Sequence, residues 1–421
     1  MNLILFTSSY PYVRGGEQNF LSNEVQHLLA EFEKVVIVPE NVDGPCFGNL
    51  LHAEIDISYA EYFASYNNFT LLLKGFFSPL FYPGLMEDKF PRFSLKALRR
   101  LIAFAGKANI TNQWVVNWLR QHNLDSRDCL FYTYWFDQAA GGITLAKRQY
   151  PELKLVSRAH GYDVFEEQYY NPPFWPCRKT VLNSVDRVFS ASTAGKSYFV
   201  NHYPEFATLF ETSLLGVPEP GFLNQPSKDG IFRIVSCSII RPEKRVDRIL
   251  SGVLHAAKLR PKQRFEWTHI GNGLMQYELQ KLADEKFPAN ARAYFPGYSD
   301  NEALMHLYGD KPFDVFINVS ETEGTPVSIM EAISCGIPVI ASAVGGNVEI
   351  VSEQNGIHLS QDPTLDEIAA ALFYLIDHPE ETEKKRGESR HIWQTRYNAQ
   401  FNFSEFAKKL KNIRLGHEHI Y

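Results

Sequence analysis

Two glutamates, Glu323 and Glu331, lie on either side of the start of a predicted helix and are separated by seven residues. Between them, Thr325 is suited to cap the helix, Pro326 fits its first position, and Gly324 leaves room for a ligand. An apolar segment just before them predicts a strand. A helix that begins beyond the carboxyl end of a parallel strand presents free N–H groups and a positive dipole end, which suit a phosphate. Carboxylates there suit hydroxyl groups, so the pattern predicts a ligand with both groups, such as a nucleotide sugar.

Lys244 and Arg245 stand at the start of another predicted helix, 246–259, which follows a predicted strand over 231–238. Basic residues at a helix start oppose the helix dipole, which favours a role toward a ligand over a role in the helix. A cation here suits a departing diphosphate, whose charge grows in the transition state. The alternative is an ordinary exposed Lys-Arg pair.

His160 ends a third predicted strand, 154–160, and is followed by Gly161 and Asp163. A single histidine is more often structural than functional, but its place after a strand favours a site. Glycines that follow strands carry a similar ambiguity: close approach to a phosphate or a simple tight turn. Those considered for a site are Gly15, Gly16, Gly271, Gly273, Gly345 and Gly346.

Strand-like and helix-like segments alternate along the whole chain, which is typical of α/β proteins with parallel sheets. The polar stretch from Gly216 to Gly230 interrupts this alternation, which then starts again. We therefore expect two Rossmann-like domains that face each other across a deep cleft, with ligands beyond the carboxyl ends of the strands. The predicted domains are 1–217, a linker at 218–230, 231–395, and a C-terminal helix in 396–421 that crosses back to the first domain.

Length and composition narrow the possibilities. A chain of 421 residues is long for one core and favours two domains. Its net charge of −6 argues against a general nucleic-acid binder. Five scattered cysteines without a C-x-x-C pair fit a reducing compartment and argue against structural zinc. The first residues do not resemble a signal peptide, so we expect a cytoplasmic protein.

The segment 74–107 departs from the acidic character of the chain. It carries seven basic and two acidic residues, interleaved with phenylalanines and Tyr82. One interpretation is a surface that lies on anionic lipid, which would make the protein peripheral at the inner face of the plasma membrane. The other is a pair of helices whose aromatic side chains pack into the core of the first domain.

The ordered set of motifs resembles family 4 retaining glycosyltransferases, which have the GT-B fold and use nucleotide-activated sugars. The resemblance covers nearly the whole chain in order. It is carried by G-G-E (15–17), R-A-H-G-Y-D (158–163), L-G-V (215–217), P-E-K-R-V-D (242–247), I-G-N-G (270–273), F-P-G (295–297), E-G-T-P with Glu331, and V-G-G-N-V-E-I (344–350).

The resemblance implies that Glu323 lies near the donor hexose, that Glu331 binds the ribose hydroxyls and that Lys244 neutralises the donor pyrophosphate. His160 would lie near the donor sugar without acting as the general base. The family often has an arginine where this chain has Ile239, so Arg241 or Arg245 would have to replace it.

The sequence thus predicts a metal-independent hexosyltransferase without a cofactor. It would use a UDP- or GDP-sugar and a glycan or lipid-linked glycan acceptor, in bacterial polysaccharide or lipopolysaccharide synthesis. The alternatives are a nucleotide-sugar epimerase or phosphorylase on the same fold, and a non-catalytic sugar-nucleotide-binding protein. A glycosidase carboxylate pair fits less well, and the absence of G-x-G-x-x-G after the first strand disfavours an NAD-dependent enzyme.

Overall fold

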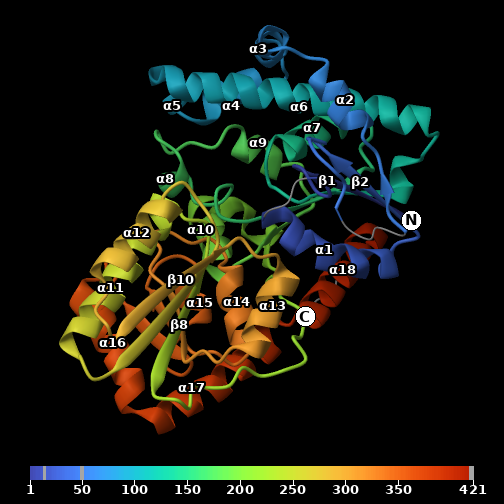
Figure 1. Ribbon diagram of the computed structural model, residues 1–421. Helices are drawn as coiled ribbons and strands as arrows, with labels where there is room; N and C mark the ends of the chain where they lie inside the picture. The colour runs from blue at the N-terminus through green and yellow to red at the C-terminus, as the bar shows by residue number, and fades with distance from the viewer. Residues whose placement is uncertain (13–15, 48–51, 417–421) are drawn as a thin grey trace. The chain divides into compact units, whose positions relative to one another are not determined.

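The computed structural model describes residues 1–12, 16–47 and 52–416. The chain divides into two compact units. Unit 1 comprises Met1–Leu215 and Phe401–Tyr421, and unit 2 comprises Gly216–Gln400. Each unit contains one sheet whose paired strands all run parallel (Figure 1).

The sheet of unit 1 has seven strands in the order β3-β2-β1-β4-β5-β6-β7. Its strands are apolar runs because both faces of the sheet are covered. The strands are β1 (Asn2–Thr7), β2 (Lys34–Pro39), β3 (Glu54–Ile55), β4 (Cys129–Thr133), β5 (Lys154–Ala159), β6 (Arg187–Ser190) and β7 (Phe210–Thr212). The helices are α1 (Gly16–Glu31), α2 (Ser58–Ala64), α3 (Asn68–Phe76), α4 (Phe81–Glu87), α5 (Phe90–Phe93), α6 (Leu95–Gln121), α7 (Gln138–Ala146), α8 (Glu166–Tyr169), α9 (Arg178–Leu182) and α10 (Thr193–His202), with 3-10 turns at Ser126–Asp128 and Pro204–Leu209.

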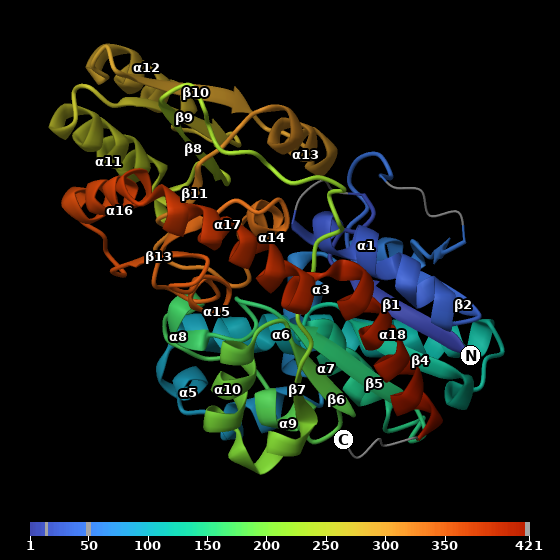
Figure 2. The same cartoon turned by 90° about the horizontal axis from the view of Figure 1, so that it is seen from below.

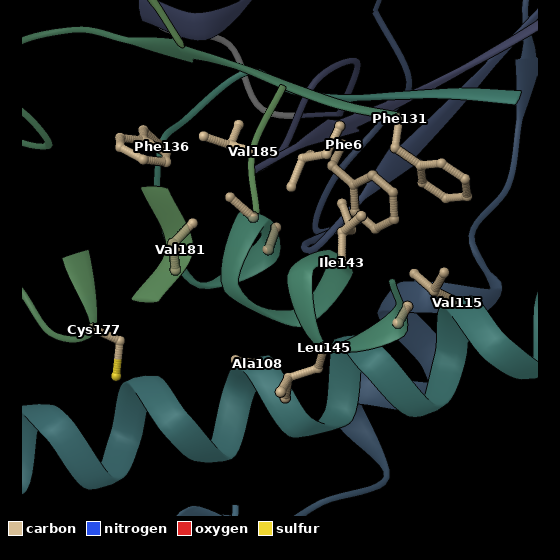
Figure 3. Packing of buried hydrophobic residues seen from close by; sticks show 14 of the residues in the cluster. Phe6, Ala108, Val115, Phe131, Phe136, Ile143, Leu145, Cys177, Val181 and Val185 are labelled. Carbon is tan, nitrogen blue, oxygen red and sulfur yellow. The ribbon is translucent and has the colours of Figure 1, made fainter. Parts of the chain in front are cut away.

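Alternate residues of the central strands enter different cores, as the twofold period of a strand requires. Ile4 and Phe6 of β1 pack with α6 and α7 on one face of the sheet. Figure 3 shows this core, in which Phe6, Phe131, Ile143 and Val115 converge. Leu3 and Leu5 pack on the other face, with α1 and α18 (Ala399–Leu415).

Helix α18 contributes to unit 1 although the rest of the C-terminal half belongs to unit 2. Phe406 and Leu410 are buried, and the Phe406 ring meets Tyr132 and Phe189 edge-on at 5.5 and 5.1 Å between ring centroids. Figure 2 shows α18 across one face of the seven-stranded sheet. Phe401, near the start of the same helix, is 63% exposed.

The sheet of unit 2 has six strands in the order β10-β9-β8-β11-β12-β13. The strands are β8 (Ile231–Cys237), β9 (Arg264–Ile270), β10 (Ala291–Gly297), β11 (Val315–Asn318), β12 (Val339–Ser342) and β13 (Gly356–Leu359). The helices are α11 (Val246–Leu259), α12 (Gln276–Lys286), α13 (Asn301–Asp310), α14 (Val327–Ser334), α15 (Asn347–Ile350), α16 (Leu365–Asp377) and α17 (Pro379–Ile392), with a 3-10 turn η3 (Pro242–Lys244) and a π-helical turn at Trp393–Tyr397.

The segment 218–230, predicted as a linker, falls within unit 2. Asn224 is buried and donates hydrogen bonds to the carbonyl oxygens of Tyr308 and Lys311, at 2.7 and 2.9 Å. Its side-chain oxygen accepts from the amide of Phe313 at 3.1 Å. Most residues of the segment are exposed, and the buried Asn224 attaches it to the backbone of unit 2.

Candidate active site

The candidate site of unit 2 lies where its strand order reverses. Strands β8 and β11 are neighbours, with β9 and β10 on one side and β12 and β13 on the other. The loops that follow β8 and β11 therefore leave the same edge of the sheet in different directions. This is the place at which open parallel sheets bind ligands.

Lys244 and Glu323 meet at this edge. The Lys244 ammonium donates to Oε1 of Glu323 at 2.6 Å. The same oxygen accepts from the Asn318 amide at 3.1 Å and from the Ser320 hydroxyl at 2.7 Å. The backbone fixes the two loops as well, because the amide of Glu321 donates to the carbonyl of Glu243 at 2.8 Å. The result is a buried carboxylate with a half-buried cation beside it.

The start of α14 corrects a detail of the sequence analysis. The helix begins at Val327, and Pro326 is its N-cap residue rather than its first helical residue. No side-chain hydrogen bond caps it, so the predicted capping role of Thr325 is wrong. At the other end, Gly336 follows the C-cap residue Cys335 with a φ of 75°, the left-handed conformation in which many helices end.

Two glycines bring the loop after β12 onto the Glu323 turn. A Cβ atom on Gly345 would lie 1.8 Å from the carbonyl oxygen of Glu323, and one on Gly346 would lie 2.1 Å from that of Gly324. The amide of Gly346 donates to the carbonyl of Glu323 at 3.2 Å. These glycines therefore hold the turn in place by close backbone packing.

Glu331 has a different environment from Glu323. It lies within α14, is 6% exposed, and accepts one hydrogen bond from the Asn301 amide at 2.6 Å. Burial raises the pKa of Glu331 to about 7, and the Asn301 hydrogen bond opposes that rise. Glu331 and Asn301 line a hollow of about 410 Å³ in unit 2, together with residues of the 217–222 segment and further residues of α13.

Gly271 and Gly273 pack against the loop that follows β8. A Cβ atom on Gly271 would lie 1.9 Å from the carbonyl oxygen of Ser238, and one on Gly273 would lie 2.2 Å from that of Ile240. Backbone hydrogen bonds join the same loops, from Ser238 to Ile270 and from Ile240 to Asn272. The glycines thus position the loop that leads to Lys244. Their expected contact with a nucleotide stays a prediction.

The two arginines near Lys244 differ in their contacts. Arg245, in a left-handed conformation with a φ of 48°, pairs with Asp362 at 3.2 Å and donates to the carbonyl of Gln361 at 3.1 Å. The Arg241 side chain is 64% exposed and approaches only Glu243, at 4.0 Å, among the described residues. Arg241 is therefore the one with a guanidinium available to a ligand.

His160 directly follows β5 in unit 1. Its ring lies among aromatic rings, 4.7 Å from Tyr134 and 4.6 Å from Trp135 between centroids. Burial, reinforced by the charge of Arg158, lowers the pKa of His160 to about 3, so the imidazole is neutral at pH 7. Its Nε2 atom is buried and has no hydrogen-bond partner among the described residues.

Asp163 and Glu17 organise the loops around this histidine. Asp163 accepts from the amide of His160 at 2.7 Å and from that of Phe136 at 2.9 Å. Glu17 accepts from the Trp135 indole and from the amides of the loop after β1. Of the expected glycines in this unit, Gly16 is the first residue of α1, and Gly15 lies outside the described residues.

Sequence reasoning missed Asn301, Asn318 and Ser320. Asn318 and Ser320 stand at the end of β11, so their position just before Glu323 was the available signal. Asn301 is 30 residues from Glu331, and no spacing rule connects the two. Within the described part of the chain, no group of three His, Cys, Asp or Glu side chains is arranged to hold a metal ion.

Comparison with known proteins places this geometry in a family. The model of the family "Glycosyl transferases group 1" matches residues 224–391, which include every site residue of unit 2. Residues 224–391 form a glycosyltransferase group 1 domain.

One similar protein matches a longer stretch of the chain than this domain. The GtfA subunit of a UDP-N-acetylglucosamine–peptide N-acetylglucosaminyltransferase from Streptococcus pneumoniae serotype 4 is 23% identical over 346 residues. That match covers 77% of this chain but only 64% of the length of the pneumococcal protein.

Several solved structures match nearly the whole chain, and two of them illustrate the likeness. The lipopolysaccharide outer core galactosyltransferase WaaB superposes with a TM-score of 0.65 at 14% identity, over 99% of both chains. Anabaena Alr3699/HepE in complex with UDP-glucose gives a TM-score of 0.62 at 16% identity, over 98% of this chain and 100% of that one. The glycosyltransferase group 1 domain therefore stands within a GT-B fold with two Rossmann-like domains.

Proposed function

We propose that this protein is a retaining glycosyltransferase that moves a hexose from a UDP- or GDP-sugar to a glycan or lipid-linked glycan. The observation that carries the proposal is the Lys244–Glu323 pair at the reversal point of the unit 2 sheet, beside the start of α14. This arrangement offers a cation for a diphosphate and a carboxylate for sugar hydroxyls. Bacterial polysaccharide or lipopolysaccharide synthesis is the proposed setting, because the similar WaaB is a lipopolysaccharide outer core galactosyltransferase.

In the proposed reaction, the bond between the anomeric carbon and the β-phosphate oxygen breaks. The bond from the same carbon to an acceptor hydroxyl oxygen forms on the same face of the sugar. The departing phosphate oxygen takes the acceptor proton, and the nucleoside diphosphate leaves. Lys244 stabilises the charge that grows on this phosphate, and Arg241 supplies the second cation.

The two glutamates have separate parts in this proposal. Glu323 holds hexose hydroxyls and orients Lys244, to which it is bonded at 2.6 Å. Glu331 binds the ribose diol, because a carboxylate can accept from two hydroxyl groups at once. His160 contributes a neutral ring that contacts the sugar. Its pKa of about 3 makes it a poor base at neutral pH.

The chemistry is proposed to need neither metal nor cofactor, because the two cations replace the charge that a metal would supply. UDP is the first nucleotide to test, since the similar GtfA belongs to a UDP-N-acetylglucosamine–peptide N-acetylglucosaminyltransferase and the similar HepE was solved with UDP-glucose. A lipid-linked acceptor would place the protein at the inner face of the plasma membrane.

The test is transfer of a radiolabelled hexose from UDP-glucose, UDP-galactose or GDP-mannose to lipid-linked saccharides extracted from bacterial membranes. We expect UDP or GDP to appear only when acceptor is present, also in excess EDTA, and the new linkage to keep the donor's anomeric configuration by NMR. Change of the sugar nucleotide without acceptor would indicate an epimerase, and release that requires inorganic phosphate would indicate a phosphorylase. Binding without turnover under every condition would favour the non-catalytic alternative.

A further inference from the structure

The apolar residues of helix α3 in unit 1 face outward and not toward the core. Phe69, Leu72, Leu73 and Phe76 of α3 follow the i, i+3, i+4, i+7 spacing of a helix face that normally packs inward. Here all four are exposed, with fractions from 44% to 69%. Figure 1 shows α3 on the side of α6 that faces away from the sheet.

Glycine contacts fix this orientation of α3. A Cβ atom on Gly75 would lie 2.1 Å from the carbonyl oxygen of Ile102 in α6, and one on Gly106 would lie 2.4 Å from that of Leu71. The two helices therefore cross with their backbones almost in contact. Lys74 points to the same side and donates to Gln113 of α6 at 2.8 Å. The opposite, apolar side of α3 must face outward.

The exposed apolar surface continues into the following helices. The rings of Phe76 in α3 and Phe81 in α4 stack at 4.7 Å between centroids. Beyond them, Phe77 and Phe93 are 80% and 84% exposed. The exposed apolar residues of this region are Phe69, Leu72, Leu73, Phe76, Phe77, Tyr82, Met86, Phe93 and Leu95. We call them, with the basic residues named next, the outer face.

Four basic residues belong to the outer face: Lys89, Arg92, Lys96 and Arg99 are exposed, and none has a carboxylate partner within the described residues. The nearest acids in sequence are occupied, since Glu87 accepts from the amide of Thr180 at 2.6 Å and Asp88 from that of Phe90 at 2.9 Å. The outer face is therefore both apolar and positive, in a chain whose net charge is −6.

Within the segment 74–107, some residues pack into the core of unit 1, while others are exposed on the outer face. Phe81 and Phe90 are partly buried against the core of unit 1, as the packing interpretation expected. Arg100 donates to backbone carbonyls at 2.7 and 3.1 Å, and Lys107 pairs with Glu40 at 2.9 Å, so neither is part of the outer face. The surface that remains begins earlier, at Phe69.

We propose that the outer face docks on the surface of an anionic phospholipid bilayer. Phenylalanine and leucine side chains enter the boundary between headgroups and acyl chains, while the lysines and arginines meet lipid phosphates. Charge favours this partner over a second copy of the chain, because two such faces would bring unpaired positive charges together. None of the described helices is long and apolar enough to cross a bilayer, so docking of this kind would be superficial.

The test is co-sedimentation of the full chain with vesicles of phosphatidylcholine alone or mixed with phosphatidylglycerol. We expect binding to the anionic vesicles only, weakened by salt. R92E/K96E is expected to lower the partition coefficient by at least about tenfold, since each basic residue near the surface contributes roughly fivefold. F69S/F77S should lower it by roughly tenfold through lost apolar insertion.

Matched controls lie in unit 2. K258E/K262E changes the net charge as R92E/K96E does, and L274S/Y277S removes two other exposed apolar side chains. Both are expected to bind vesicles as the wild type does. None of these residues belongs to the candidate active site, so the result is independent of the proposed transferase activity.

Three outcomes would overturn the proposal. They are absence of binding to anionic vesicles, an equal loss of binding in the unit 2 controls, and equal binding by all variants. Sedimentation without lipid provides a further check, because a wild-type dimer that F69S/F77S converts to a monomer would show that the outer face joins two copies instead.

Discussion

Glu323 and Glu331 lie on the same short stretch of chain, yet they differ in the charge and the number of the hydrogen-bond donors around them. Glu323 has a cation at 2.6 Å and two further donors on one oxygen. Glu331 has one amide donor, and burial raises its pKa to about 7. The first carboxylate is held in place before any ligand arrives. The second is poised between its neutral and charged forms, and hydroxyl donors from a ligand would favour the charged one.

For the proposed reaction, this contrast predicts different parts for the two carboxylates. Glu323, bound to Lys244, would fix the position of the cation and is expected to act on the chemical step. Glu331 would have to lose a proton before it accepts two hydroxyl groups, so it is expected to act on binding and to make that binding depend on pH. The comparison predicts that changes near Glu323 alter turnover and changes near Glu331 alter affinity and stability.

The largest effect is expected from Lys244→Ala. Loss of a cation at the departing phosphate should lower kcat by roughly 100-fold to 1000-fold. The Kd of the sugar nucleotide should change much less. Steady-state kinetics and titration calorimetry separate the two quantities, and Lys258→Ala, a change at an exposed lysine of α11, is the matched control. A kcat close to that of the wild type would show that Lys244 does not stabilise the departing phosphate.

Glu331→Gln is expected to stabilise the free protein at high pH. A raised pKa means that the folded chain holds a proton that the unfolded chain has lost, so the contribution of Glu331 is favourable below about pH 4.5 and is lost as pH rises through about 7. At pH 8 the amide should therefore raise the free energy of unfolding by at most about 3 kcal/mol. Urea denaturation at pH 8 and near pH 5 measures the difference, which should shrink at the lower pH. An equal effect at both values would contradict the assigned pKa.

The affinity for UDP-glucose should depend on pH through the same group. In the proposed site the ribose diol is held by the ionised carboxylate, and a pKa of about 7 leaves most Glu331 side chains protonated at pH 6 in the free protein. The Kd should therefore fall by about tenfold between pH 6 and pH 8 and level off above that. In Glu331→Gln the affinity should be lower and nearly independent of pH. A wild-type profile as flat as that of the variant would separate Glu331 from the nucleotide.

The smallest effect is expected from Asn301→Ala. The amide of Asn301 opposes the rise in the Glu331 pKa, so its removal should shift the pH profile of binding upward by less than about one pH unit. Calorimetric titrations at closely spaced pH values can resolve this shift. Asn318→Ala, at the other glutamate, should leave the midpoint unchanged, and a shift in both variants would argue against separate roles.

Much of the scaffold follows from sequence patterns. The predicted helix 246–259 matches α11 to the residue, and the predicted strands 154–160 and 231–238 end one residue beyond β5 and β8. Amphipathic helices and buried strands have clear sequence patterns. The family resemblance implied that Lys244 and Glu323 both lie near the donor, but it did not predict their direct hydrogen bond. Nothing in the local sequence connects residues 79 positions apart.

Other features depend on packing that sequence does not reveal. Asn301 and Glu331 meet because α13 and α14 are brought together by the fold, and Thr325 fails to cap because the chain enters α14 through Pro326. For a related reason, the sequence could not distinguish the two interpretations of the segment 74–107. Periodicity identifies an apolar helix face but does not say which way it turns, and close contacts at Gly75 and Gly106 decided that here.

The most direct test of the account is a thermal-shift screen of the wild type and of Glu331→Ala against UDP-, GDP-, ADP- and dTDP-sugars. A ligand that binds only the folded protein raises its Tm. We predict selective stabilisation of the wild type by sugars of one nucleotide, UDP or GDP, and a much smaller shift in the variant. Absence of a shift with every sugar nucleotide, or an equal shift in both proteins, would contradict the assignment of the unit 2 site as the donor site.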